Sequence, residues 1–300
     1  MKKYTLAIIT LLASTLLFNS CKKEYDSIES VDEAAISAYI KKNNLTGMKR
    51  DALGVYYQVL DAGSGDLIKN ADSVLFTYQE KSITDGSVYY TTSANGNDGT
   101  YLGYMRNRFN GSWSEALNNL KFGGKVRLLV PSHLAYGKNG SSSPNVPSNA
   151  IIDTYITTST YTRQWQWDDV KIQAFLAAKG LTATKDISRV YYITNTPGTG
   201  TDVIDENSTI VFKYTGRFVD GTVFDSSTDG TFSITLANVI KGWGKIVPKY
   251  TAGAKFRIII PSDLAYGSSG SISASTGLPD GVIPANAILD FDLEIVSVTN

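Results

Sequence analysis

Apolar and polar positions along the chain follow one plan that occurs twice. Each half opens with apolar residues three and four positions apart, which is typical of an amphipathic helix. These residues are Ala35, Ile36, Tyr39 and Ile40 in the first half and Ile172, Phe175 and Leu176 in the second. Runs rich in β-branched and aromatic residues follow, and each closes on an Asp-Gly pair that favours a hairpin turn. The run 289–295 alternates apolar with acidic residues, which predicts a strand with one buried face.

Several short blocks recur in the same order in both halves. The recurring pairs are VYY at 55–57 and 190–192, VPSHLAYG at 130–137 and IPSDLAYG at 260–267, and VPSNAIID at 146–153 and IPANAILD at 283–290. A repeat at nearly constant spacing in a chain of 300 residues predicts two similar domains. We place the first domain at 31–160 and the second domain at 161–300.

Each domain is predicted to be α+β: an antiparallel sheet wrapped on one short helix and preceded by an extra N-terminal helix. Trp113 and Trp243 mark the two short helices. Ser112 and Glu115 offer a capping box for the first helix. Glycines around Trp243, followed by Pro248, predict that the second helix is the shorter one.

The N-terminus is typical of an export signal. A basic start is followed by the apolar stretch 6–18, which is too short to span a membrane easily and ends just before Cys21. This pattern resembles a bacterial lipoprotein signal peptide over 1–20, with Cys21 as the lipidated first residue and 21–30 as a tether. The protein is then expected in the cell envelope, held to a membrane, the outer one by this interpretation, on its periplasmic or its surface side. An ordinary secretory signal with an incidental cysteine is the alternative.

Composition removes several classes of function. The chain has 28 Lys and Arg against 28 Asp and Glu, so it lacks the basic excess with which proteins bind nucleic acid. One Cys and one His leave no disulfide framework and no Cys/His zinc site. A hydrolase triad would have only His133, which we interpret as a solvated turn residue. We therefore expect no metal, no cofactor and no nucleic acid partner.

Five ordered blocks give the second domain a specific resemblance. They are VFKYTG at 211–216, DGTVFDSS at 220–227, VIKGW at 239–243, IPSDLAYG at 260–267 and VIPANAILDFDLEIV at 282–296. Over 202–299 the chain resembles an FKBP-type peptidyl-prolyl cis-trans isomerase, and over 66–157 it resembles the same family more weakly. The resemblance implies an enzyme that accelerates isomerisation of X–Pro bonds in exported proteins without a cofactor. A non-catalytic peptide-binding or chaperone module of the cell envelope is the alternative.

The resemblance also implies a set of pocket residues. The catalytic set is Tyr214, Phe224, Asp225, Trp243, Tyr266 and Phe291. The substrate-binding set is Phe232, Val239, Ile240, Val282 and Ile283. By the same resemblance, Trp243 forms the floor, Asp225 orients Tyr214, and the Tyr266 hydroxyl and the Ile240 N–H donate to substrate carbonyls.

The first domain departs from this set at several positions. Tyr89-Tyr90 replaces Phe224-Asp225, Phe109-Asn110 replaces Val239-Ile240, Thr154 replaces Phe291, and Glu80 replaces Gly216. These changes remove an aromatic wall and the orienting carboxylate. We expect the first domain to be a weak or inactive isomerase whose use is binding or spacing.

Overall fold

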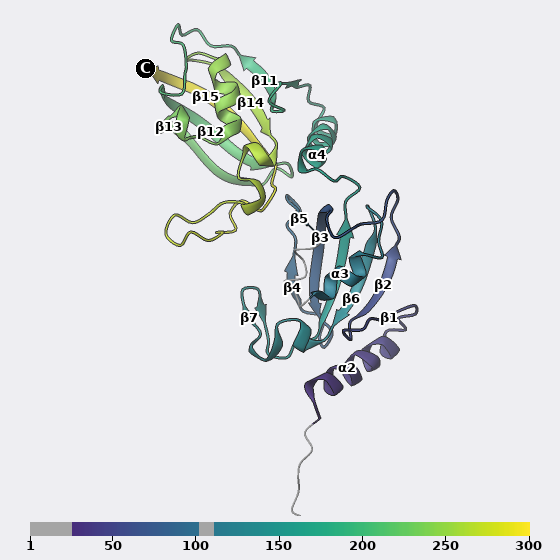
Figure 1. Ribbon diagram of the computed structural model, residues 1–300. Coiled ribbons are helices and arrows are strands. Elements are labelled where there is room, and N and C mark those ends of the chain that lie inside the picture. The colour runs from purple at the N-terminus through teal and green to yellow at the C-terminus, as the bar shows by residue number, and fades with distance from the viewer. Residues whose placement is uncertain (1–25, 102–110) are drawn as a thin grey trace, which may run out of the picture.

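The computed structural model describes residues 26–101 and 111–300. Figure 1 shows two lobes, each built on one sheet, with the helix α2 (Ile28–Lys42) beyond the first sheet and α4 (Gln164–Lys179) beside the second. The predicted lipidation site Cys21 and the pair Phe109-Asn110 lie outside the described residues.

The first sheet is antiparallel throughout. Within the described residues its strand order is β1-β2-β6-β9-β3-β4, and β5 also pairs with β3. The strands are β1 (Lys49–Arg50), β2 (Tyr56–Asp61), β3 (Ser73–Ser82), β4 (Val88–Thr91), β5 (Asp98–Tyr101), β6 (Lys125–Val130) and β9 (Ile152–Thr158). A small separate hairpin joins β7 (Ser141–Ser142) to β8 (Asn145–Val146).

The second sheet repeats this topology. Its order is β10-β11-β14-β15-β12-β13, again with antiparallel pairs only. The strands are β10 (Thr184–Lys185), β11 (Tyr191–Thr196), β12 (Thr209–Phe218), β13 (Val223–Thr235), β14 (Lys255–Ile260) and β15 (Leu289–Thr299). The predicted α+β class with antiparallel sheets is confirmed.

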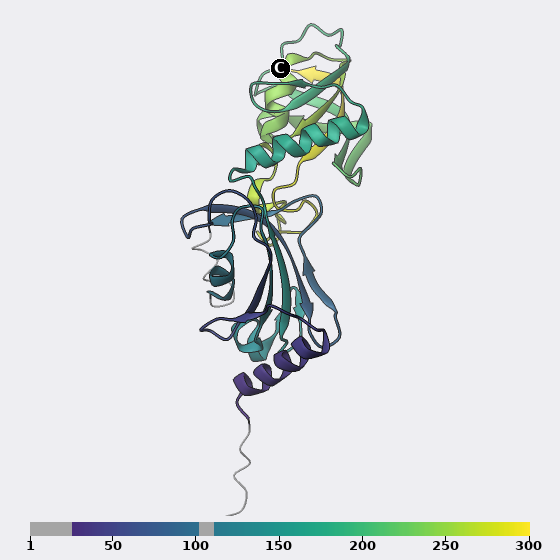
Figure 2. The same ribbon diagram turned by 90° about the vertical axis from the view of Figure 1, so that its right-hand side faces the viewer.

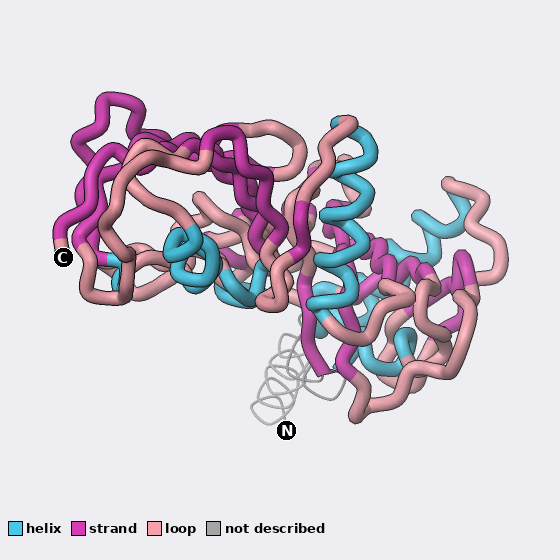
Figure 3. Tube along the Cα trace, turned by 90° about the horizontal axis from the view of Figure 1, so that it is seen from above, coloured by secondary structure: helices cyan, strands magenta, loops and turns pink. Residues whose placement is uncertain are grey.

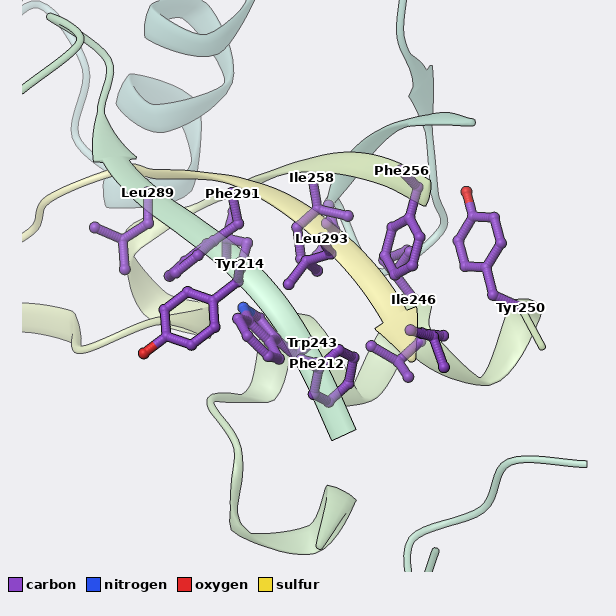
Figure 4. Packing of buried hydrophobic residues seen from close by; sticks show 14 of the residues in the cluster. Phe212, Tyr214, Trp243, Ile246, Tyr250, Phe256, Ile258, Leu289, Phe291 and Leu293 are labelled. Atoms are coloured by element: carbon purple, nitrogen blue, oxygen red, sulfur yellow. The ribbon is translucent and has the colours of Figure 1, made fainter. Parts of the chain in front are cut away.

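One short helix packs against the inner face of each sheet. These helices are α3 (Ser112–Leu117) and α5 (Lys241–Ile246), and they bury Trp113 and Trp243 in the two main cores. Figure 4 shows Trp243 between Tyr214 and Phe212 beneath the strands β12 and β15.

Two predictions about these helices are wrong. The N-cap of α3 is Gly111, at φ 87°, and Ser112 is a buried residue inside the helix, so no capping box forms. The second helix is not shorter, because both have six residues and a 3₁₀ turn, Val247–Lys249, extends α5. Gly242 serves close packing instead, since a Cβ there would lie 2.4 Å from the Ile260 side chain.

Each extra N-terminal helix is held by one buried aspartate. Asp32 accepts hydrogen bonds from the Ser132 N–H at 2.8 Å and from its hydroxyl at 2.9 Å. Asp168 accepts the matching pair from Ser262, at 2.8 and 2.7 Å. His133 lies in a turn, as predicted, but its Nδ1 is 3.2 Å from Asp32 and its side chain is 28% exposed, so it also contacts the helix.

The outer face of each sheet carries a buried ion pair. Arg127 binds Asp153 through Nε and Nη2 at 2.9 and 2.7 Å, and Arg257 binds Asp290 in the same way at 2.7 and 2.5 Å. The ring of Phe175 on α4 lies 5.7 Å from the Arg257 guanidinium. Asp290 is therefore only 1% exposed, although strand alternation predicted that it faces away from the core. Figures 2 and 3 show α4 from two further directions, beside the second sheet.

None of the helices in the described residues combines the length and apolarity that a membrane crossing requires.

Candidate active site

An aromatic cavity of about 150 Å³ lies between the inner face of the second sheet and the start of α5. Nine of the predicted residues line it, and they come from separate elements: Tyr214 from β12, Phe224, Asp225 and Phe232 from β13, Val239, Ile240 and Trp243 at α5, Tyr266 from the loop after β14, and Phe291 from β15. The fold thus brings together residues that are up to 77 positions apart in sequence. The remaining two predicted residues, Val282 and Ile283, do not line this cavity.

Edge-to-face ring contacts hold the aromatic walls. The Trp243 ring lies 5.6 Å from Tyr214 and 5.2 Å from Phe291, at interplanar angles of 76° and 86°. Phe224 meets Phe291 at 5.6 Å and 88°. A Cβ at Gly216 would lie 2.6 Å from the Phe291 ring, so glycine is needed there for the rings to close. Such mutually supporting rings make a rigid apolar surface with the Trp243 indole as its floor.

Few polar groups face this cavity. The Tyr214 hydroxyl donates to Asp225 at 2.6 Å, and burial together with this carboxylate raises the pKa of Tyr214, so its proton is retained at neutral pH. The Tyr266 side chain is 41% exposed, and within the described residues its hydroxyl has no hydrogen-bond partner. Ile240 is the N-cap of α5, and within the same residues its N–H donates to no carbonyl. Two donors are thus available to a ligand.

The last two predicted residues lie on the long loop that follows Tyr266. Val282 is 53% exposed and does not line the cavity. Ile283 is buried in the core cluster that includes the walls, and its N–H donates to Ser271 at 2.8 Å. Ile234 and Asn238 also line the cavity and were not predicted. Strand alternation could have identified Ile234, because it lies two positions after Phe232 on β13 and so shares its face.

The matching region of the first domain is built differently. Tyr78, Trp113 and Tyr90 gather there, with Tyr78 and Tyr90 stacked at 4.6 Å. Glu80 is fully buried and accepts a hydrogen bond from the Tyr136 hydroxyl at 2.8 Å. Burial raises the pKa of Glu80 to about 7.

Register explains how Glu80 fits. In the second sheet, Gly216 pairs with Phe291, whose ring covers the glycine. In the first sheet, Glu80 pairs with Thr154, and this threonine leaves room for a longer neighbour. The hydroxyl of Tyr136, which matches Tyr266, is therefore bound to a carboxylate of its own domain.

No group of three or more His, Cys, Asp or Glu side chains with the spacing of a metal site occurs in residues 26–101 and 111–300.

Comparison with known proteins gives one consistent description. A family model described as FKBP-type peptidyl-prolyl cis-trans isomerase matches residues 65–154 and 200–296. The chain is 34% identical over 106 residues to the FKBP-type isomerase FkpA of Escherichia coli K12, which covers 35% of this chain and 37% of that protein. It is 37% identical over 106 residues to the isomerase Fkbp12 of Drosophila melanogaster, covering 34% of this chain and 91% of that protein.

A solved peptidyl-prolyl isomerase from Pseudomonas syringae pv. tomato is 29% identical, with a TM-score of 0.38, and covers 45% of this chain and 96% of that one. The chain spans a little over a third of the length of FkpA.

Proposed function

Because the chain belongs to the family of FKBP-type peptidyl-prolyl cis-trans isomerases, we propose that it isomerises X–Pro bonds and that its second domain carries the activity. The observation that supports this assignment is the difference between two matching tyrosines. Tyr266 keeps its hydroxyl available beside an aromatic floor, whereas the Tyr136 hydroxyl is bound to Glu80.

The pocket acts on the amide without a nucleophile. Rotation about a peptide bond is opposed by about 18–20 kcal/mol of resonance, and water favours the planar, charge-separated form. The walls of Trp243, Phe224 and Phe291 exclude water, which favours the less polar twisted amide. The Tyr266 hydroxyl and the Ile240 N–H donate to carbonyls of the substrate and hold the bond in place while it turns. Each reduction of about 1.4 kcal/mol in the barrier accelerates the reaction tenfold.

The first domain is proposed to be a poor isomerase. Thr154 removes the wall that Phe291 forms in the second domain. Glu80 brings a carboxylate to a surface that must be apolar for the reaction. It also accepts the hydrogen bond of the Tyr136 hydroxyl, which a substrate carbonyl would otherwise accept.

Matched tyrosine variants test which domain is active. Tyr266→Phe is expected to lower kcat/KM about fivefold, the size of one lost hydrogen bond of about 1 kcal/mol, while Tyr136→Phe leaves it unchanged. The measurement is isomerisation of a short X–Pro peptide by the full chain, followed by exchange NMR. A lower kcat/KM in Tyr136→Phe alone would show that the first domain carries the activity. Absence of activity in the folded wild-type chain would favour a peptide-binding module instead.

We further propose that the substrates are exported proteins and that lipid on Cys21 holds the chain to the outer membrane. The apolar stretch 6–18 ahead of this cysteine supports the proposal. Cys21→Ser is expected to move the protein from the membrane fraction to the soluble fraction, and wild type should carry the added mass of acyl chains. A wild-type protein that is soluble and unmodified would instead indicate an ordinary secretory signal.

A further inference from the structure

A turn of the first domain reaches the second domain. In the second sheet, β13 pairs with β12 on both sides of residues 228–231, which have no partner on β12. In the first sheet, the matching edge is divided into β4 and β5, and residues 93–97 leave the ladder between them. We call residues 93–97 the docking turn. It contacts the end of the long loop that follows Tyr266 in the second domain, a loop that Figures 1 and 2 show next to the first sheet.

Buried hydrogen bonds join the docking turn to this loop. The Asn97 N–H donates to the Ala285 carbonyl at 3.3 Å. The Asn286 amide donates to the Asn97 carbonyl at 3.0 Å and to its side-chain oxygen at 3.2 Å. Asn97 and Asn286 are 1% and 6% exposed, so both are enclosed by the contact. Separating them would leave polar groups to be solvated or unpaired, which opposes opening.

The fit also depends on a glycine and on a contact at the rim. A Cβ at Gly96 would lie 2.2 Å from the Ala285 carbonyl oxygen, so only glycine allows the two backbones to approach this closely. At the edge of the contact, the Asn95 amide donates to Asp220 of the second domain at 2.8 Å. The docking turn is thus shaped to this one surface.

The contacted residues lie at the end of the loop that begins directly after Tyr266. We call residues 267–283 the flap and residues 284–286 the flap base. The Asn286 N–H donates to the Gly267 carbonyl at 2.8 Å, so the flap base is tied to the start of the flap, directly after Tyr266. A short chain of contacts therefore runs from Asn97 through Asn286 and Gly267 to the tyrosine that faces the cavity.

The two ends of the flap are held, whereas its middle makes few contacts with the rest of the domain. Ile283 is buried in the core and its N–H donates to Ser271, but Ile272, Leu278 and Val282 are 53%, 65% and 53% exposed. In the first domain, the Asn149 N–H makes the matching bond to the Gly137 carbonyl at 2.9 Å, but Asn149 is exposed. A loop whose middle makes few buried contacts takes its position from its ends.

We propose that the docking turn of the first domain positions the flap and Tyr266 of the second, so that the first domain sets substrate affinity in a pocket it does not contain. Asn97 and Gly96 are then positioning residues, and the proposal rests on the proposed activity of the second domain. The flap carries the predicted substrate-binding residues Val282 and Ile283 but does not line the cavity itself. Loosening it is therefore expected to raise KM more than it lowers kcat.

Two substitutions in the full chain test this. The backbone at Gly96 is outside the left-handed region, so Gly96→Ala adds only the obstructing Cβ. Gly96→Ala and Asn97→Ala are each expected to raise KM about fivefold, the size of one lost hydrogen bond, with kcat within about twofold of wild type. Hydrogen exchange at the flap amides should accelerate in parallel.

A matched variant and an independent readout keep the test decisive. Ala94→Ser changes an exposed residue of the same turn, which makes none of these hydrogen bonds, and should keep the wild-type KM. Unchanged KM and unchanged flap exchange in Gly96→Ala would overturn the proposal. If the wild-type chain has no isomerase activity, the proposed function fails, and flap exchange alone still decides whether the docking turn positions the flap.

Discussion

Replacing Phe291 by threonine, the residue at the matching position of the first domain, is expected to lower kcat/KM for X–Pro isomerisation about 100-fold, equivalent to about 2.7 kcal/mol. The Phe291 ring is 5% exposed and contacts both Trp243 and Phe224. Threonine would remove the wall between them and place a hydroxyl in the cavity. Water would then reach the substrate amide and restore the advantage of its planar form. The measurement is the same NMR exchange assay with the full chain.

Loss of a buried ring also lowers stability, so the activity needs a matched control. Ile295→Thr removes a fully buried side chain from the same strand and core without touching the cavity. Both variants should unfold at lower temperature, and only Phe291→Thr should lose activity at a temperature where both are folded. Equal losses of activity would mean that Phe291 acts only through stability and would remove it from the catalytic set.

Replacing Glu80 by glutamine is expected to stabilise the first domain above neutral pH. Burial raises the folded-state pKa of Glu80 from 4.5 to about 7, so the folded domain binds a proton that the unfolded chain has released. Above pH 7 the buried charge lowers stability by about 3 kcal/mol, at about 1.4 kcal/mol for each pKa unit. This penalty disappears as the pH falls from 7 toward 4.5. Glutamine keeps an acceptor for Tyr136 and carries no charge.

Native-state hydrogen exchange at the β3 and β9 amides measures the free energy of unfolding of the first domain within the full chain. Glu80→Gln should exceed wild type in stability by about 2–3 kcal/mol at pH 8 and match it near pH 4.5. Glu115→Gln changes an exposed glutamate on α3 of the same domain and serves as the control. A difference that is constant with pH would show that Glu80 does not titrate in this range.

Local chemistry explains why much of the second domain could be predicted. Alternation along β12 and β15 places Tyr214 and Phe291 on the inner face, and the order of the blocks brings α5 beneath them. The same alternation along β13 would also have predicted Ile234. Val282 and Ile283 were harder, because the flap has no periodicity from which the direction of a side chain can be read.

Other features depend on neighbours that are remote in sequence. Alternation assigned Asp290 to the outer face but could not predict its burial, because Arg257 of β14 pairs with it and Phe175 of α4 packs on that arginine. Glu80 could be recognised as a departure from Gly216, whereas its bond to Tyr136 joins residues 56 positions apart.

The sequence by itself determined the repeat, the α+β class and most of the residues around the cavity, because these follow from periodicity and short blocks. Only the tertiary structure decided which tyrosine hydroxyl is available and where the docking turn lies. Asn97 and Asn286 are 189 positions apart, and their contact depends on the placement of two domains. No local pattern records such a contact, since its free energy comes from polar groups and backbones that meet only after both domains have folded.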